Sequence, residues 1–430
     1  MSSDIKFYDI HLDVPQNTHI QRKAHDILTN LGLRLGRQFV QTPHADHQIS
    51  YTSDAWIWRV AGVPSDRLSA AFQAAVNIFD FKHLKPDPGF PNRPTLVGYD
   101  PRHAFLDEIF ATIGAVLNLT PAPDTTNAKP KIIVQITHDV DNPQLLTAYQ
   151  LARSFALLLR GRRAELPVLK AAVRSLITWG TGWASREAVD PFWCFGKIHG
   201  LGQTYGFRST FFTHAQYPAR HARDPRYKVS HARYQTVLSE LADQGHEIGL
   251  HSGINFNDFR TTRETLPTDP IRSHRAHYWA APPHDLEQWY DTMAQAGISG
   301  DASISPQKIG YALGSLYPVK FTTQSGHVIV LYPSQFMDAY HLKELAEDFI
   351  LDSVSNAQMS AAGRVHGVLP VINLNWHVRT FSGIGPWLGY DTAFTSLLDT
   401  LTNRFDVTFQ TVGQSTISFK KALREFKFTS

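Results

Sequence analysis

The chain has 430 residues, of which 43% are hydrophobic and 12% aromatic, so it can bury the core of one large domain and a smaller one. Its 41 Lys and Arg residues nearly balance 38 Asp and Glu residues, and a net charge of +3 on this length argues against nucleic acid as a partner. The single cysteine, Cys194, excludes an internal disulfide and a cysteine-based zinc site.

The N-terminal segment MSSDIKFYDIHLDV lacks the basic stretch and apolar core of a secretory signal. No apolar run in the sequence approaches the 18 residues that suggest a transmembrane helix. We therefore expect a cytoplasmic protein without a membrane span, and the single cysteine fits a reducing compartment.

Residues 1–128 mix short strand-like and helical segments, which predicts a smaller N-terminal α+β domain. Helical periodicity is visible at Ala70–Phe81 and Ala104–Leu117, but no group of residues in this region points to a particular chemistry. The Pro- and Thr-rich stretch 121–130 is typical of a linker. We therefore place the domain boundary there and assign residues 129–430 to the main domain.

Six basic residues are interleaved with leucines and alanines between Leu145 and Trp179. A basic amphipathic helix of this kind can lie on an anionic membrane, which makes peripheral membrane contact through 145–179 one interpretation. The other, which we favour from the sequence, is a solvated helical insertion that packs by its leucine face on the main domain.

Strand-like and helical segments alternate regularly after residue 130. The predicted strands are Lys131–Thr137, Ser209–Thr213, His246–Leu250, Val328–Tyr332, Val368–Trp376 and Val407–Thr411. The predicted helices lie at Tyr234–Leu241, closed by Gly245, at Leu286–Met293, closed by Gly297, and near 341–357 and 389–404. This rhythm predicts an α/β fold, either a βα barrel or a doubly wound sheet.

Polar side chains follow several of these strands, at the end where reactive groups gather in barrels of this kind. They are Asp139 and Asp141, His251, Arg275 with His277 and Tyr278, and His377. Carboxylate and imidazole together suit Zn²⁺ or a similar divalent ion. Two aspartates separated by one residue point the same way on a strand, so one could bind the ion while the other accepts a proton from water. The alternative is that both simply cap a following turn.

Six short motifs, taken together, resemble a known family. The strings ITHDVDN, GFRSTFFTH, GHEIGLHSG, RAHYW, GDAS and LNWHV occur in this order from residue 136 to 378. They resemble the successive motifs of the polysaccharide deacetylases, the NodB homology or carbohydrate esterase 4 family, and specifically a bacterial branch with an extra N-terminal domain. The resemblance implies a distorted (β/α)₇ barrel and metal-dependent removal of an N-acetyl group from an amino sugar.

The resemblance also implies roles for individual residues. Asp139 corresponds to the general base and Asp141 to a metal ligand, with His251 as the first histidine ligand. Arg275 would orient Asp139 by an ion pair, and the backbone N–H of Tyr278 would help stabilise the tetrahedral oxyanion.

The remaining implied roles concern the departing amine and the sugar. His377 resembles the general acid, which needs an imidazolium near neutral pH. Asp301, in GDAS, is a candidate to orient His377 and raise its pKa. Trp376 could stack against a sugar ring, although it could equally be a core residue.

The sequence departs from the family pattern at Asn255, where a second ligand histidine is usual. An amide oxygen is a poor zinc ligand, so the third ligand is open. We favour His277, with Asn255 or water as alternatives. His246 is disfavoured because five positions separate it from His251 along a strand, which turns it to the opposite face.

Three functions remain in view. The leading one is a divalent-metal-dependent deacetylase acting on a saccharide, such as a nucleotide- or lipid-linked intermediate of glycan synthesis. A hydrolase of another C–N bond, in an amide or ureide, would use the same geometry. A catalytically silent barrel that binds a glycan or a protein is the third, supported by Asn255, although it leaves the acid and base groups without a use.

Overall fold

The computed structural model describes residues 6–425 except 17, 36, 53–54, 89, 101–102, 120–128, 183–184, 220, 255–257, 269, 306–309, 312 and 339–367. Most of the expected linker, the helix expected near 341–357 and Asn255 therefore lie outside the described residues. No helix in the described part of the chain is long and apolar enough to span a bilayer.

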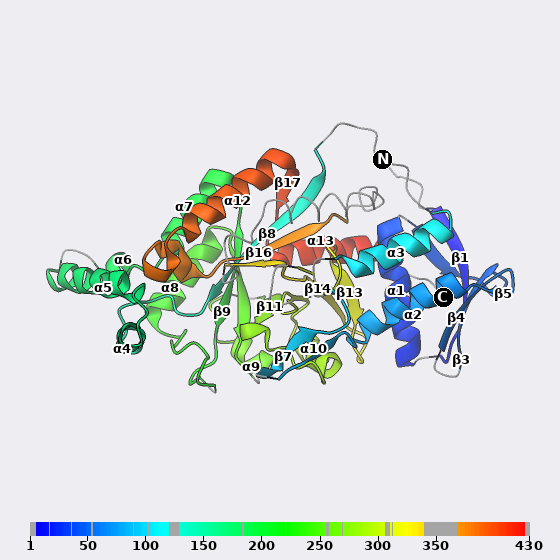
Figure 1. Ribbon diagram of the computed structural model, residues 1–430, viewed down its shortest axis with the longest axis horizontal. Coiled ribbons are helices and arrows are strands. Elements are labelled where there is room, and N and C mark those ends of the chain that lie inside the picture. Colours follow the sequence, from blue (N-terminus) through cyan, green and yellow to red (C-terminus); the bar gives the residue numbers. More distant parts are fainter. Residues whose placement is uncertain are drawn as a thin grey trace.

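The N-terminal part contains a five-stranded sheet in the order β2-β1-β3-β4-β5, with three helices beside it (Figure 1). Its strands are β1 (Lys6–Asp13), β2 (Arg37–Gln41), β3 (His47–Thr52), β4 (Ala55–Val60) and β5 (Val63–Pro64). Its helices are α1 (His19–Leu35), α2 (Asp66–Phe79) and α3 (Phe105–Val116), and a separate hairpin joins β6 (Leu84–Asp87) to β7 (Phe90–Leu96). Ser65 caps α2 by accepting a hydrogen bond from the amide of Leu68, as a good N-cap residue does.

A ten-stranded sheet organises the rest of the chain, in the order β13-β14-β12-β11-β10-β9-β8-β16-β15 with β17 also paired to β8. The strands are β8 (Lys131–Val140), β9 (Ser209–His214), β10 (Glu247–Ser252), β11 (Ser273–Ala276), β12 (Gly300–Asp301), β13 (Val319–Thr322), β14 (Val328–Leu331), β15 (Phe336–Met337), β16 (Val371–Asn375) and β17 (Asp406–Phe409). All pairs are parallel except β13 with β14. The α/β prediction is confirmed, and the sheet curls as a half-barrel (Figure 1). Among the strands that the structure describes, no pairing joins β13 to β15.

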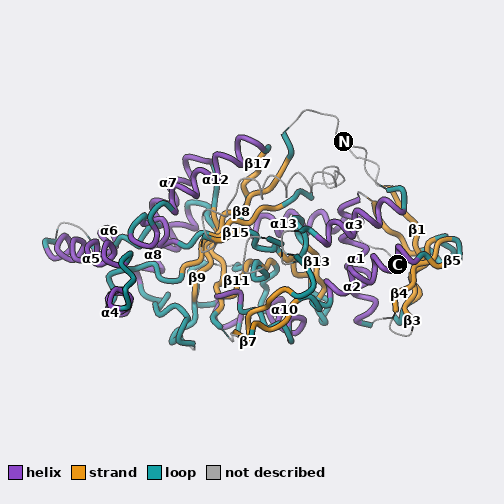
Figure 2. The backbone as a smooth tube through the Cα atoms, viewed as in Figure 1, coloured by secondary structure: helices purple, strands orange, loops and turns teal. Residues whose placement is uncertain are grey.

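Helices cover the outside of the curled sheet (Figure 2). They are α7 (Phe195–Tyr205), α8 (Ala232–Asp243), α9 (Phe259–Arg263), α10 (Leu286–Gln295), α12 (Tyr390–Arg404) and α13 (Val412–Glu425). The apolar stripe predicted for α10 is buried, and Gly245 and Gly297 follow α8 and α10 with φ of +84° and +82°, where a residue with Cβ would be strained. These predicted helices are confirmed.

A helical hairpin made of α4 (Ala148–Leu159) and α5 (Glu165–Gly180), followed by the short α6 (Arg186–Val189), projects from the end of the molecule opposite the N-terminal sheet (Figure 1). Asp190 fixes its base, because its two carboxylate oxygens accept hydrogen bonds from the amides of Leu145 and Leu146 at 2.9 and 2.8 Å. Thr147 caps the start of α4 by accepting from the amide of Gln150.

Helix α1 covers the edge strand β13, which would otherwise present unpaired backbone groups. Asn30 accepts from the amide of Lys320 at 2.9 Å and donates to its carbonyl at 3.0 Å. One turn earlier, Asp26 accepts from the amide and the hydroxyl of Thr322, both at 2.6 Å. The N-terminal part is thus attached to the curled sheet through hydrogen bonds that the side chains of α1 make to β13.

Candidate metal and catalytic site

The C-terminal ends of β8, β10 and β11 bring four of the predicted site residues together. Asp139 lies near the end of β8 with Asp141 just beyond it, and His251 lies near the end of β10. His277 opens the short 3₁₀ helix η1 (His277–Trp279) directly after β11. All four residues are buried, each with at most 6% of its surface exposed, so their side chains are turned away from the solvent.

Asp141, His251 and His277 form a group whose ligand atoms all lie within 4.8 Å of one another. The Nε2 atom of His251 is 3.2 Å from Oδ1 of Asp141, and the Nε2 atom of His277 is 3.6 Å from Oδ2. Two ligands of one tetrahedral zinc ion, each about 2.0–2.1 Å from it, lie about 3.3 Å apart. Oδ1 of Asp141 and Nε2 of His251 are buried without a hydrogen bond, which is costly for polar atoms unless an ion binds them. The residues present therefore fit a divalent ion.

Both imidazoles are oriented through the ring nitrogen that faces away from this group. Nδ1 of His251 donates to the carbonyl oxygen of Arg275 at 2.8 Å, and Nδ1 of His277 is 3.0 Å from Oδ1 of Asp224. Partners of this kind fix the tautomer that leaves Nε2 free for a metal, and a carboxylate partner also makes the imidazole a stronger ligand. Asp224 comes from an irregular segment before α8 and is 3% exposed.

Replacing Asp224 by asparagine is expected to weaken zinc binding about 10- to 100-fold, because the amide keeps the shape but loses the charge that strengthens His277. Competition against a coloured chelator measures this affinity. The matched control is Asp301→Asn, which removes a buried carboxylate from the different imidazole of His274. Equal zinc affinity in the Asp224 variant and the wild type would remove Asp224 from the site.

Charges within the group shift the pKa values of its members in opposite directions. Burial alone would raise the pKa of Asp141, but the positive charges of His277 and His377 hold it well below its usual range. Burial would lower the pKa of His277, but Asp141 and Asp224 together raise it to about 9. A divalent ion bound to Nε2 of His277 would take the place of the proton that the imidazole holds when its pKa is raised.

Asp139 makes the predicted ion pair with Arg275 at 3.0 Å through Oδ1. Its Oδ2 accepts a hydrogen bond from Nδ2 of Asn375 at 2.9 Å and lies 4.0 Å from Nε2 of His251. Burial would raise the pKa of Asp139, but Arg275 and then His251 lower it to about 2. The carboxylate of Asp139 therefore stays ionised beside the Asp141, His251 and His277 group, called the metal group below.

Arg275 is completely buried inside the curled sheet and uses its donors in several directions. Besides Asp139, it donates to the Thr137 hydroxyl at 2.8 Å, the Ser334 hydroxyl at 3.0 Å and the Asn373 side-chain oxygen at 2.9 Å. Its guanidinium also lies 4.5 Å from the ring centroid of Phe212. Such a network lets a cation be buried without an unsatisfied charge.

His377 follows β16 on the other side of the same group. Its Nε2 is 3.2 Å from Oδ2 of Asp141, and its Nδ1 is 2.9 Å from Oδ1 of Asp338. The backbone amide of His377 also donates to Asp338 at 2.7 Å, so the ring and its orienting carboxylate form one unit. Burial would lower the pKa of His377, but the negative charge of Asp338, followed by that of Asp141, raises it to about 10.

The prediction that Asp301 orients His377 is wrong, because Asp338 occupies that position. Asp301 lies in register with His274 and accepts from it at 2.8 Å, and it also accepts from the hydroxyl of Tyr290 at 3.1 Å. Side chains alternate along a strand, so Asp301 and His274 face the covering helices while Arg275 faces the site.

The suggestion that Trp376 stacks on a sugar is also wrong. Its side chain is fully buried, its indole N–H donates to the carbonyl of Tyr390 at 3.2 Å, and its ring packs against Phe394. It is therefore a core residue. Tyr278 offers an aromatic surface instead, since it is 43% exposed and lines the cavity at the site.

The backbone is unusual at Tyr278 and Trp279, where φ is +56° and +50°. A residue with a side chain pays roughly 1–2 kcal/mol for this left-handed region, and such strain gathers at functional sites. The turn places Tyr278 beside the metal group, next to His277.

Several residues at the site carry no signal in the sequence. Asp338 follows a two-residue strand, too short for periodicity, Asp224 lies in an irregular segment, and Arg379 lies in the short 3₁₀ helix η4 (Val378–Ser382). Arg379 is 3.4 Å from Asp141, and Arg93 of β7 lines the same cavity, so the N-terminal part contributes to its wall. His246 and His138 lie elsewhere, each bonded to Ser209. His214 ends β9 and lies in register with His251 on the neighbouring strand. Its position at a strand end is a signal in the sequence, but its spacing from other histidines does not indicate a metal site.

A cavity of about 470 Å³ opens above the group. Asp141, His277, Tyr278, Arg379 and Trp387 line both this cavity and a second hollow. The second hollow shares Asn142, Tyr149 and Gln150 with a third. The three hollows therefore adjoin in a row, called the groove below, that starts at the Asp141, His251 and His277 group.

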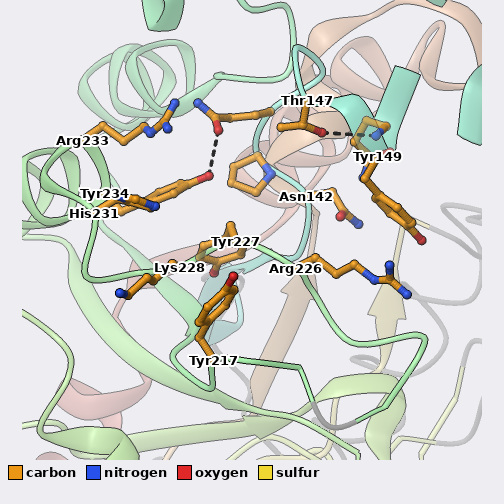
Figure 3. A pocket seen from close by; sticks show the side chains of 13 residues that line it. Asn142, Thr147, Tyr149, Tyr217, Arg226, Tyr227, Lys228, His231, Arg233 and Tyr234 are labelled. Carbon is orange, nitrogen blue, oxygen red and sulfur yellow. Dashed lines mark hydrogen bonds between the residues drawn. The ribbon is translucent and has the colours of Figure 1, made fainter. Parts of the chain in front are cut away.

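Figure 3 shows the far end of this groove, which is lined by tyrosines and basic side chains. Arg226 lies 4.5 Å from the ring centroid of Tyr149 there, and the hydroxyl of Tyr234 donates to Gln144 at 2.9 Å. Tyrosine faces suit the C–H side of a sugar, and the cations favour anionic substituents.

No family model matches the sequence, and no curated protein does. Among solved structures, the chain is similar to a protein described as a polysaccharide deacetylase from Mycobacterium smegmatis, at 14% identity and a TM-score of 0.41, over 72% of this chain and 96% of that one. It is similar to Puue allantoinase at 11% identity and a TM-score of 0.42, over 70% and 94%. It is also similar to the catalytic domain of peptidoglycan N-acetylglucosamine deacetylase from Eubacterium rectale, at 9% identity and a TM-score of 0.28, over 68% and 93%. Similarity of this degree concerns the fold alone.

Proposed function

We propose that the protein is a metal-dependent hydrolase that removes the N-acetyl group from an amino sugar. The observation that carries the proposal is the buried Asp141, His251 and His277 group, in which Oδ1 of Asp141 and Nε2 of His251 lack a hydrogen bond, beside the ionised Asp139 and the charged His377. When bound there, a divalent ion supplies Lewis acidity, which polarises an acyl carbonyl and acidifies nearby water.

The residues of the chain divide the proton transfers between them. Asp139 is kept ionised by Arg275, so its carboxylate can accept the proton that water gives up as it attacks the carbonyl carbon. His377 lies on the same cavity and carries a proton that Asp338 stabilises, so it can protonate the nitrogen as the C–N bond breaks. We assign to the backbone N–H of Tyr278 the stabilisation of the oxyanion that forms when water attacks the carbonyl carbon.

The groove supports a saccharide longer than one sugar, with an anionic substituent. We assign the reacting unit to its first cavity, and the tyrosines and cations of its far end line a hollow in the same row. A ureide or a simple small amide would leave that hollow unused, which is why we favour the amino sugar over the other C–N substrates.

The test is acetate release by zinc-reloaded and chelator-stripped protein from N-acetylglucosamine oligomers and from a nucleotide-linked N-acetylamino sugar. We expect release only from the zinc-loaded protein, and none from Asp139→Asn, which changes one oxygen to an amide nitrogen. Saccharide binding without release by the loaded wild type would instead make the barrel catalytically silent. Turnover of allantoin alone would assign it to another C–N bond.

A further inference from the structure

The fully buried residues of the α4 and α5 hairpin are mostly polar or small. Gln150 and Ser154 of α4 are buried, as are Glu165, Val168, Ala172 and Ser175 of α5. The apolar cluster beneath the hairpin contains only five buried residues, two of them from α5. Leu151 packs against this cluster, and Leu157, Leu158 and Leu169 are half-buried, so the segment does rest partly on its leucines, whereas Leu159, Leu166 and Leu176 are exposed.

Large apolar side chains cover the outer surface of the hairpin instead. Leu159 is 73% exposed and Ile177 is 64% exposed. Of the 14 large hydrophobic side chains that are exposed in the described part of the chain, eight lie on this hairpin. Tyr149 lines the hollows described above, and the other seven are Phe155, Leu159, Leu166, Val173, Leu176, Ile177 and Trp179. A concentration of this kind marks an interaction surface.

The hairpin surface is also strongly basic. Its exposed charged residues are all cations: Arg153, which lines the second hollow, and Arg160, Arg162, Arg163, Lys170 and Arg174. Its one acidic residue, Glu165, is buried, and none of the six cations forms an ion pair with a residue that the structure describes. The surface that covers the hairpin must therefore be both apolar and anionic.

We propose that the hairpin of α4 and α5 binds an anionic membrane surface. Apolar side chains can enter the boundary between headgroups and acyl chains, while Arg and Lys stay at the level of the anionic headgroups. A second copy of this chain is a poorer occupant, because it would place six cations against six cations. The hairpin projects from one end of the molecule, where a flat membrane can reach it (Figure 1). This inference stands apart from the proposed chemistry.

The experiment is flotation with vesicles of phosphatidylcholine alone, and with vesicles in which one third of the lipid is phosphatidylglycerol. We expect the wild type to float with the anionic vesicles only. Leu159→Ser/Ile177→Ser should lower the partition coefficient at least tenfold, because two aliphatic side chains no longer leave water. Arg160→Gln/Arg162→Gln/Arg163→Gln should lower it roughly a hundredfold, because three basic groups are lost.

Matched variants away from the hairpin serve as controls. Val63→Ser/Ile417→Ser removes two apolar side chains that are 66% and 55% exposed, and Arg67→Gln/Lys421→Gln/Arg424→Gln removes three exposed cations. Both should float as the wild type does, and all variants should keep its melting temperature. The proposal is overturned if the wild type does not float with anionic vesicles, or if the controls lose as much binding as the hairpin variants. It is equally overturned if the wild type is a dimer that Leu159→Ser/Ile177→Ser converts to monomer.

Discussion

His377→Gln is expected to lower kcat by about 10²- to 10⁴-fold while zinc and saccharide binding remain near wild type. The glutamine side chain can still form hydrogen bonds, but it has no transferable proton for the departing amine. In the structure Nδ1 of His377 is hydrogen-bonded to Asp338, and the negative charge of Asp338 raises the pKa of the ring and so favours its protonated form. Steady-state kinetics on the zinc-loaded variant measure the loss, and isothermal titration measures saccharide binding.

The position of Asp338 provides a second, graded test of this role. Asp338→Asn removes the charge that contributes most to raising the pKa of His377. Because the acid form is active and is lost as pH rises through that pKa, the alkaline limb of the pH–rate profile should move to lower pH. A His377→Gln variant with unchanged kcat would show that another group protonates the amine.

Arg275→Met is expected to lower the free energy of unfolding by about 3–5 kcal/mol, the loss typical when one partner of a buried ion pair is removed. The variant keeps much of the volume but leaves Asp139 as a buried charge without its cation. It also deprives the Thr137, Ser334 and Asn373 oxygens of a donor. Urea unfolding followed by circular dichroism measures the change.

The double variant Arg275→Met/Asp139→Asn separates the ion pair from the rest of the network. Removing the stranded charge should restore part of the lost stability, so the two substitutions should be clearly non-additive. Strict additivity, or a loss below about 1 kcal/mol in Arg275→Met, would mean that the ion pair contributes little to the fold.

Much of the fold and part of the site follow from regular patterns in the sequence. Strands and helices alternate after residue 130, and the apolar spacing of Leu286, Trp289, Tyr290 and Met293 predicts the buried face of α10. Asp139, Asp141 and His251 can be placed together because parallel strands bring their C-terminal ends to one edge.

The errors arise where such patterns are missing or ambiguous. Asp301 stands at a strand end like the true site residues, and only its register with His274 reveals that it faces the other way. Asp338, the residue that takes its expected place, follows the two-residue strand β15. Asp224 reaches His277 from an irregular segment. Contacts of this kind depend on the tertiary path of the chain, which no local spacing encodes.

The hairpin shows a further limit of sequence patterns. Its leucines and arginines predict an amphipathic helix, but periodicity does not say which face is turned toward the protein. In the structure the buried residues of α5 include small and polar side chains, such as Ala172 and Ser175, which the leucine and arginine spacing does not point to.

The central claim is that Asp141, His251 and His277 together bind one divalent ion. The most direct measurement is the zinc content of chelator-stripped and reloaded protein, for the wild type and for Asp141→Ala, His251→Ala and His277→Ala. We predict about one ion per wild-type chain and none in any of the three variants. A wild type that binds no zinc would contradict the claim as a whole, and a His277→Ala variant that retains it would show that the third ligand comes from elsewhere.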